Sequence, residues 1–583
     1  MKRIVCGILV LILLMSLCSC GFEQATETNL GTTIDQQDIQ TDTGIHIRDK
    51  NLLYSQYDDT EIVTMYLTVS VGNEGEGTNH TWEEINTYSA YDYDRMGVDR
   101  YKVAGLIQVG DENGLVAGEL GYGQVAPNCT VQIRGQSSSR NQQKNYKISI
   151  KDNKGDWRGQ TTIALNKHMS EGLRFRNKMA FDMLADIDEL MSLRTTFVRL
   201  YVKDTTKSAD AKFEDYGIYT QVEQLNKTAL KAHGLDNRGH LYKINYCEFY
   251  RYEDIIVLKD DPRYDLKKFE EILEVKGDDD HTKLINMLDK VNDYSIPIEQ
   301  ILAEHFDMEN IAYWMAFNIM VGNIDTQSRN FYIYSPQNVD RWYILPWDCD
   351  AMLRRSEYAI LGRVDYEEWE SGASNYWGNV LFQRCLKSEE FRKALDEAVE
   401  TLRAKFTPEY IHSYATTYAN ILRPLLYQGR DLTYMPVTQT EYTQVLNSLN
   451  DEITDNYNRY KASLEKPMPF YIGKPMPKND GYTVEWDSSY DLNGEDVTYT
   501  FELSNNLNFT NPIVSLSGLV IPTASIPKLP AGQYFMRVTS TNDSGQTQVA
   551  FDYYRYDRGK VYGTKCFYVD AKGTVTEDIY DET

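Results

Sequence analysis

The chain of 583 residues is too long for one ordinary hydrophobic core, so two or three domains are expected. Its hydrophobic content of 42% and charged content of 25% are typical of a folded protein. The formal net charge of −26 repels phosphate backbones, so we expect no nucleic acid partner. ATP is not excluded, because a phosphate pocket needs only a few local cations.

The N-terminus predicts export and anchoring. Two basic residues precede the apolar run 4–17, which has the length of a signal-peptide core and is too short to span a membrane. The run ends in Leu-Cys-Ser-Cys, which resembles a bacterial lipobox with Cys20 as the lipidated residue. We therefore expect a signal peptide over 1–20, a flexible tether over 21–44 and an extracytoplasmic protein anchored to the membrane by lipid.

Strand patterns follow the tether. The alternating, β-branched segment 61–71 predicts a strand within a β-rich region over 45–128. Residues 130–152 predict a strand, a small polar loop and a second strand. In that second strand Tyr146 and Ile148 share one face, and Lys147 falls on the other.

Helical patterns come next. A helix is predicted over 170–193 with Ser170 as its N-cap, followed by the two strands of a hairpin, TTFVRLYVK and YGIYTQVEQ. Asp307 is expected to cap a helix that is apolar on nearly every face and ends at Gly322. Further helical patterns occupy 388–464.

A run of prolines between 467 and 477 marks a domain boundary. The strand patterns of 473–583 predict an all-β sandwich similar to fibronectin type III or immunoglobulin domains. The spacing from Pro530 to Tyr534 resembles a tyrosine corner, and Trp486 would be the core tryptophan of an early strand. Residues 562–583 fit an extra strand or a tail equally well.

The segment 322–350 carries the strongest chemical signal. A loop presents Asp325 and then Asn330, a hairpin follows, and its second strand leads to Asp348 and Asp350. Phosphoryl transfer uses such a set: one carboxylate positions the acceptor hydroxyl and takes its proton, while an amide oxygen and a second carboxylate hold magnesium. Asp and Asn are also common in turns, and Asp350 could simply cap the next turn.

Six motifs in this chain occur in the order and style of the CotH kinase family. They are RGQSSSRNQQKNYKISI, LRFRNKMAFDML, YGIYTQVEQLNK, RGHLYKI, GNIDTQSRN and ILPWDCD. The match runs from about Cys129 to Ala351, with weaker helical similarity beyond. The resemblance implies an α+β fold, with an atypical two-lobed protein kinase domain over 129–466.

The resemblance also implies an activity. Family members transfer the γ-phosphate of ATP, with Mg²⁺ or Mn²⁺, to Ser or Thr of secreted, cell-envelope or spore-coat proteins. By position, Asp325 matches the catalytic aspartate and Asp348 the metal-binding aspartate, with Asn330 and Asp350 as further candidate metal ligands. The expected nucleotide-binding set is Arg134, Gly135, Ser137, Ser138, Ser139, Lys144, Lys147 and Glu223.

Some of these assignments have alternatives. Lys147 is the first choice for the phosphate-binding lysine; Lys144 is the second, and could instead be a solvated loop lysine. Glu223 could contact adenine, pair with Lys147 or form a structural ion pair. The chain lacks G-x-G-x-x-G, His-Arg before Asp325 and Phe-Gly after Asp348, so it departs from ordinary kinases.

Two other functions fit part of the pattern. A glycoside hydrolase could use Asp325 and Asp348 as its carboxylate pair, but that reading gives Asn330 and the basic strand no role. The alternative to catalysis is an inactive kinase-like scaffold or binding lipoprotein of the cell envelope.

Overall fold

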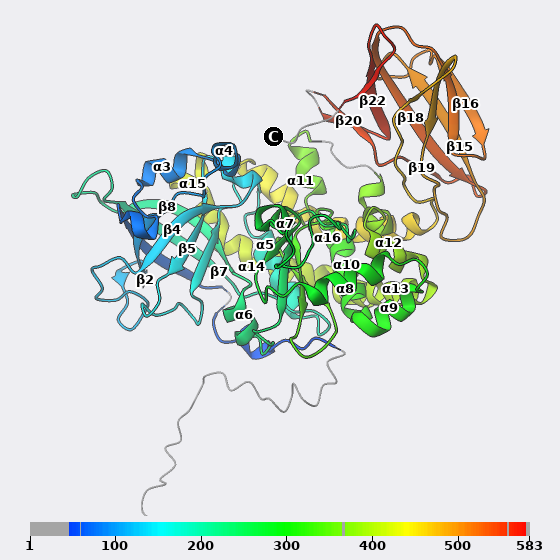
Figure 1. Ribbon diagram of the computed structural model, residues 1–583. Coiled ribbons are helices and arrows are strands. Elements are labelled where there is room, and N and C mark those ends of the chain that lie inside the picture. The colour runs from blue at the N-terminus through cyan, green and yellow to red at the C-terminus, as the bar shows by residue number, and fades with distance from the viewer. Residues whose placement is uncertain (1–45, 59, 364–367, 557–558, 579–583) are drawn as a thin grey trace, which may run out of the picture. The chain divides into compact units, whose positions relative to one another are not determined.

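The computed structural model describes residues 46–58, 60–363, 368–556 and 559–578 (Figure 1). Cys20 and the whole of the expected tether lie outside these residues, so the signal peptide, the tether and the lipidation stay predictions. The described chain is a mixed α and β protein. None of its described helices is long and apolar enough to cross a membrane.

Seven strands close into a barrel. The sheet order is β1-β7-β8-β6-β5-β4-β2, and β1 also pairs with β2, which closes the sheet on itself. Inward side chains such as Met65, Ile107, Val131 and Ile148 are fully buried inside it. The strands are β1 Ile62–Ser70, β2 Val103–Asp111, β4 Cys129–Arg134, β5 Asn145–Ile150, β6 Thr162–Asn166, β7 Thr195–Asp204 and β8 Glu214–Glu223, with β3 Gly114–Leu115 added beside β2.

This closure corrects the boundary expected between 128 and 129. β1 lies parallel to β7 and antiparallel to β2, so strands from both sides of that boundary share one sheet and one core. The hairpin expected from TTFVRLYVK and YGIYTQVEQ is confirmed as β7 and β8. Short helices α3 Trp82–Thr87 and α4 Ala90–Met96 precede β2.

The helix predicted over 170–193 is shorter than expected. It is α5 Arg176–Ala185, and Ser170 does not cap it. Arg174 has a left-handed backbone (φ 62°), and the backbone N–H of Arg176 donates to the side chain of Glu171. The residues before the helix therefore form a folded turn held by buried polar contacts, which apolar periodicity does not reveal.

A second sheet and a helical region follow the barrel. The sheet order is β10-β9-β11-β12, from Leu273–Val275, His240–Ile244, Phe331–Ser335 and Tyr343–Pro346. The predicted helix is α10 Met308–Val321, with Asp307 accepting from the N–H of Asn310 at its start and Gly322 left-handed at its end. The other helices are α6 Lys227–Ala232, α7 Leu266–Ile272, α8 Thr282–Asn292, α9 Ile298–His305, α11 Arg355–Ile360, α12 Val380–Lys387, α13 Glu389–Lys405, α14 Pro408–Leu426, α15 Gly429–Leu432 and α16 Gln439–Leu464.

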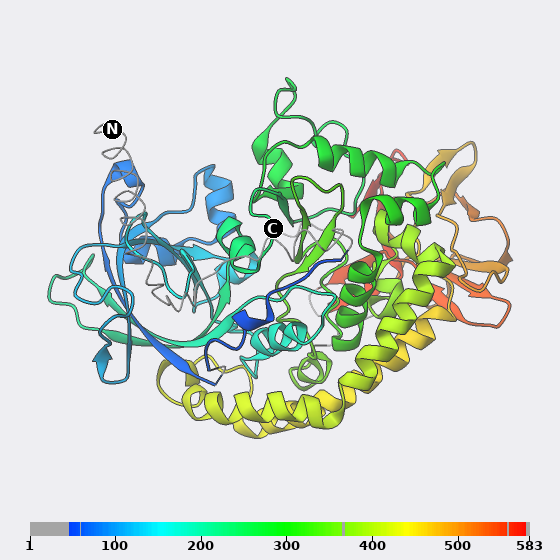
Figure 2. The same cartoon turned by 90° about the horizontal axis from the view of Figure 1, so that it is seen from below.

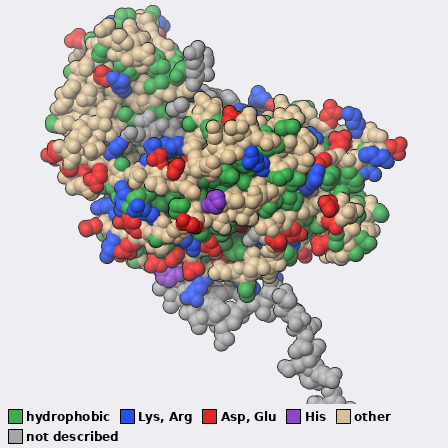
Figure 3. All heavy atoms as spheres, turned by 180° about the vertical axis from the view of Figure 1, so that it is seen from behind, with side chains coloured by type: hydrophobic (Ala, Val, Ile, Leu, Met, Phe, Trp, Pro, Cys, Tyr) green, Lys and Arg blue, Asp and Glu red, His purple; other side chains and the backbone are tan. Residues whose placement is uncertain are grey.

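The helices form the largest core. α10 packs against α13 and α16, and α14 and α15 pack against β8. Figure 2 shows these long helices in lime to yellow, running beside the strands. On the face seen in Figure 3, Lys and Arg side chains are interspersed with Asp and Glu.

The C-terminal residues form two antiparallel sheets around their own core. One sheet joins β13 Met476–Lys478, β14 Gly481–Glu485 and β17 Thr523–Pro527; the other joins β16 Val514–Leu519, β15 Val497–Ser504, β18 Gly532–Asn542, β22 Thr564–Val569 and β23 Val575–Glu577. β19 Thr547–Val549 pairs with β18, and β20 Tyr553–Tyr556 with β21 Gly559–Tyr562.

Details of this sandwich match the sequence patterns. The hydroxyl of Tyr534 donates to the carbonyl of Pro530 at 2.9 Å, the contact expected of a tyrosine corner. Trp486 is buried and stacks on Phe501. Phe470 already belongs to this core, so the sandwich starts before the expected residue 473.

Candidate active site

Asp325 lies in the loop after α10 and is held by two neighbours. Arg329 Nε donates to one carboxylate oxygen at 2.6 Å, and Asn330 Nδ2 donates to the other at 2.9 Å. The side chain of Asp325 is 42% exposed. Burial of part of the group, more than any neighbouring charge, raises its pKa above the ordinary value. The loop therefore presents an oriented, accessible carboxylate that takes up a proton more readily than an ordinary aspartate.

Asp348 and Asp350 follow β12 and interact strongly. Burial and the charge of Asp350 raise the pKa of Asp348 to about 6. Burial also opposes ionisation of Asp350, but the hydrogen bond and charge of His168 outweigh it and lower the pKa. His168 Nδ1 lies 3.2 Å from Asp350 Oδ2. Two close carboxylates of this kind are stabilised by a shared cation.

Helix α5 fixes the loop that carries these aspartates. The N–H of Cys349 donates to Asn177 Oδ1 at 3.2 Å, and Arg176 Nε donates to the carbonyl of Leu353 at 3.1 Å. Arg176 is fully buried and pairs with Glu357 at 2.6 Å. The Arg-Asn-Lys motif, identified from sequence only as a family feature, thus positions the candidate metal ligands.

Arg134 and Lys147 lie on the outer face of the barrel, at the end of β4 and in β5. The Arg134 guanidinium is 5.8 Å from the ring centre of Trp347, and the charges of Asp348 and Asp350 act on it. Burial lowers the pKa of both cations. Among the described residues neither has a hydrogen bond or an ion pair from its side chain. Two half-buried cations without a hydrogen-bond or ion-pair partner among the described residues favour an anionic ligand.

Three charged residues that lie in or beside the second sheet were not identified from the sequence. Lys243 in β9 stands opposite Glu274 in β10, with Nζ 3.6 Å from Oε2. Lys276 Nζ lies 2.5 Å from Glu274 Oε1. Lys243 also interacts electrostatically with Asp348. Lys147 interacts electrostatically with Glu274 and Lys276. The signal for Lys243 was its place in the RGHLYKI motif; nothing in the sequence paired it with Glu274.

Glu223 does not join this group. It lies 2.5 Å from Nη2 of the partly buried Arg194 and 2.9 Å from Nε2 of His233, which is buried with it. Of the readings considered from sequence, the structural ion pair is the one observed. Its assignment to nucleotide binding was wrong, because both carboxylate oxygens are already occupied.

Lys144 and the serine loop are also engaged elsewhere. Lys144 Nζ donates to the carbonyl of Ser139 at 2.6 Å and borders a separate cavity with Trp82 and Tyr219. The loop itself forms a short 3-10 helix, Ser137–Arg140. Gly135 before it is left-handed (φ 87°), and Ser138 Oγ accepts from Asn145 at 3.0 Å. Ser137 is exposed, whereas Ser139 is buried and donates to the carbonyl of Gln136.

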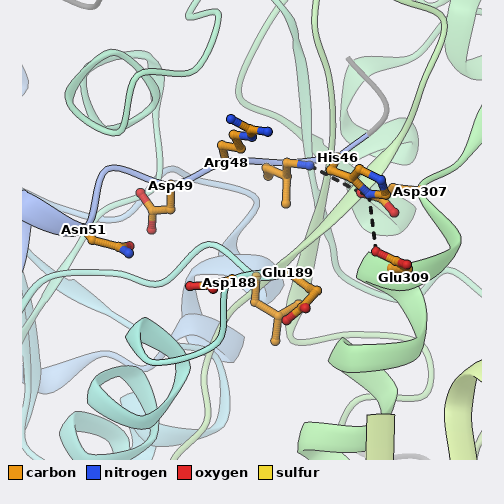
Figure 4. A pocket seen from close by; sticks show the side chains of 10 residues that line it. His46, Arg48, Asp49, Asn51, Asp188, Glu189, Asp307 and Glu309 are labelled. Atoms are coloured by element: carbon orange, nitrogen blue, oxygen red, sulfur yellow. Dashed lines mark hydrogen bonds and ion pairs between the residues drawn. The ribbon is translucent and has the colours of Figure 1, made fainter. Parts of the chain in front are cut away.

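A different pocket, of about 360 Å³, is shown in Figure 4. His46 Nδ1 lies 3.5 Å from both Asp307 and Glu309, and the pocket also includes Asp188 and Glu189. Asp307 is occupied as the cap of α10. Within the described part of the chain no three His, Cys, Asp or Glu side chains are grouped to hold a metal ion. The pocket therefore does not replace the Asp325 and Asp348 group as the candidate site.

The comparison with protein families shows that this is a kinase-like protein. A family model described as "CotH kinase protein" matches residues 131–460, more than half of the chain, and the chain belongs to that family. It is 24% identical over 302 residues to the inner spore coat protein H of Bacillus subtilis (strain 168), a match that covers 51% of this chain and 77% of that protein.

Among solved structures, the proinflammatory kinase CtkA of Helicobacter pylori covers 54% of this chain and 94% of its own, at 10% identity and a TM-score of 0.26.

Proposed function

We propose that this protein is an ATP-dependent protein serine kinase acting on extracytoplasmic proteins. The proposal rests on one observation: the β11–β12 hairpin carries polar and acidic side chains on both of its flanks. Asp325 and Asn330 precede β11, and Asp348 and Asp350 follow β12; these two strands pair with each other. Arg134 interacts electrostatically with Asp348 and Asp350 from the barrel, and Lys147 interacts in turn with Arg134 and Glu274.

In the proposed reaction Asp325 accepts the hydrogen bond of the acceptor hydroxyl and takes its proton as the new oxygen–phosphorus bond forms. The bond between the γ-phosphorus and the β,γ-bridging oxygen of ATP breaks in the same step, and ADP leaves with that oxygen. Arg134, Lys147 and Lys243 orient and neutralise the phosphates. Asn330, Asp348 and Asp350 would hold magnesium or manganese, which supplies further charge neutralisation when bound. The donor set fits a hard cation, since two carboxylates and an amide oxygen leave places for phosphate oxygens and water.

We further propose that the barrel and the helical region are the two lobes of a kinase-like domain, and that the C-terminal sandwich belongs to the fibronectin III-like class. Lipidation at Cys20 would place the enzyme on the outer side of the cell membrane. The spore-coat name belongs to the relative from Bacillus subtilis; envelope or coat proteins with acceptor serines are the proposed substrates here.

Replacing Lys147 with Ala is expected to raise the KM for ATP about tenfold or more, because one charge-assisted contact to phosphate is lost. Turnover should fall as well. Lys144→Ala is the matched control, because Lys144 lies three residues earlier but donates a hydrogen bond to the carbonyl of Ser139. Initial rates over a range of ATP concentrations measure both variants. Equal KM values for the two variants would contradict the assignment of Lys147.

Replacing Asp348 with Asn should weaken metal-dependent nucleotide binding. The loss of a direct ligand should cost at least the roughly 10- to 100-fold that removal of an outer-shell partner costs. Calorimetric titration with a non-hydrolysable ATP analogue, with and without magnesium, measures the effect. His168→Gln, which removes only the partner of Asp350, is expected to give a smaller loss. Unchanged magnesium-dependent affinity in Asp348→Asn would remove it from the metal site.

A further inference from the structure

The segment Glu368–Asn379 holds the loop that carries Asp325. Asn375 Nδ2 donates to the carbonyl of Ile324 at 3.1 Å, and Asn379 Nδ2 donates to the carbonyl of Gln327 at 2.8 Å. Between them, the hydroxyls of Tyr376 and Thr326 lie 3.0 Å apart. Two side chains of this segment therefore hold the backbone on both sides of Asp325, and a third contacts the side chain of Thr326.

The same segment is supported from two directions. From the helical region, Ser463 in α16 accepts from the N–H of Ala373 at 3.0 Å. From the C-terminal sandwich, Phe551 meets Trp369 edge to face with ring centres 5.0 Å apart, and Tyr562 meets the same Trp369 at 5.8 Å. The hydroxyl of Tyr562 also donates to Glu370 at 2.7 Å.

A second aromatic contact lies at the other end of the segment. Tyr490 of the sandwich stacks on Trp377 with ring centres 5.5 Å apart, and Lys387 Nζ lies 5.3 Å from both rings. Each such aromatic pair contributes beyond its buried area. The sandwich thus contacts the segment near its start, at Trp369, and again at Trp377, which lies between the loop-holding residues Tyr376 and Asn379.

The sandwich is joined to the rest of the chain by ordered contacts. Leu492 and Phe551 are buried in the core of the helical region rather than in that of the sandwich. The connection after α16 is hydrogen-bonded as well. Asn542 Nδ2 donates to the carbonyl of Glu465 at 3.1 Å, and the N–H of Met468 donates to the carbonyl of Tyr490 at 2.7 Å. A freely moving appended domain would have neither feature.

We infer that the C-terminal sandwich is an internal support for the catalytic loop, acting through the segment Glu368–Asn379. Trp369 and Tyr376 are then positioning residues, and this role rests on the proposed function of Asp325. Loss of the support should loosen the loop and lower kcat. It should change the KM for ATP less than it changes kcat, because Arg134, Lys147 and Lys243 lie on other elements and Asn330 is the proposed nucleotide-site residue that the loop carries.

Hydrogen exchange in the full chain tests the inference without requiring activity. Trp369→Ala should speed amide exchange in residues 323–330 roughly three- to tenfold, the range expected for the loss of such aromatic contacts. kcat for phosphate transfer should fall in the same proportion. Tyr562→Phe, which keeps the ring and removes only the bond to Glu370, should give a smaller change in the same direction.

Tyr568→Ala is the control, because Tyr568 is exposed on β22 and its hydroxyl contacts only sandwich residues, Gln533 and Asp578. It should leave exchange in 323–330 unchanged. If Trp369→Ala and Tyr562→Phe both fold and neither alters exchange there, the support role is overturned, whatever the activity. If exchange rises but the wild type transfers no phosphate, the support stands and the proposed function fails.

Discussion

Replacing Asp325 with Asn is expected to slow phosphate transfer by roughly two to four orders of magnitude while nucleotide binding is kept, as for loss of a general base. The reason is chemical: an amide oxygen still receives a hydrogen bond from the acceptor hydroxyl but cannot take its proton. The charged ligands of the nucleotide, Lys147 and Asp348, lie on other elements and are not altered.

The variant also changes the loop slightly. Asp325 accepts from both Arg329 and Asn330, and an amide has one acceptor oxygen for these two donors. About 1 kcal/mol of stability is therefore expected to be lost, so melting must be measured beside activity. Asp340→Asn is the matched control, since Asp340 lies in the turn of the same hairpin and pairs with His305. Transfer by Asp325→Asn at the rate of Asp340→Asn would refute the catalytic assignment.

Replacing His233 with Gln should give the largest loss of stability. Both ring nitrogens face carboxylates, with Nδ1 2.6 Å from Asp49 and Nε2 2.9 Å from Glu223. The imidazole is completely buried, and the carboxylates of its partners are nearly so. Removal of the charge leaves two buried carboxylates undercompensated, which typically costs about 3–5 kcal/mol. Asp49 lies near the start of the described residues, so this segment should be released first.

The ionisation of His233 determines whether stability rises or falls with pH. Burial opposes its charge, but Asp49 and Glu223 outweigh burial and raise the pKa of His233 to about 10, above about 6.5 for an unfolded histidine. The contribution of His233 to the free energy of unfolding is full below about pH 6.5 and is lost as pH rises toward 10. Burial opposes the charge of Glu223 too, but His233 and Arg194 lower its pKa to about 2, so its contribution is lost only in acid.

Denaturant unfolding at several pH values measures this effect. The gap between wild type and His233→Gln should be largest near pH 6 and should shrink as pH approaches 10. His412→Gln, at an exposed position of α14, should show no such gap. A gap that stays constant from pH 6 to 10 would mean that the ion pair is not its source.

The fold was predictable where local patterns decide it. Alternation gave β1, β4 and β5, and the capping Asp307 and terminal Gly322 gave α10. Barrel closure was not predictable, because the pairing of β1 with β2 and β7 is set by contacts between distant segments. The start of α5 was missed because buried charges, not apolar spacing, determine it.

The site divides in the same way. One hairpin carries the candidate catalytic and metal-binding residues on its two flanks: Asp325 and Asn330 before it, Asp348 and Asp350 after it. Because the two strands of a hairpin pair with each other, the proximity of these residues could be predicted from their order in the sequence. Glu223 was misassigned because its partner His233 lies beyond the strand, and a carboxylate at a strand end gives no sign of what neutralises it. The row of Lys243, Glu274 and Lys276 needs the register of β9 and β10, which the sequence does not fix.

Phosphate transfer by this chain can be measured directly. The purified protein, lacking only the signal peptide, is incubated with γ-labelled ATP, magnesium or manganese, and generic secreted proteins, and phosphopeptides are identified by mass spectrometry. We predict label on serine in the added proteins or in the chain itself, and none with Asp325→Asn. ATP binding by the wild type without transfer to any protein, itself included, would contradict the kinase assignment and favour an inactive scaffold.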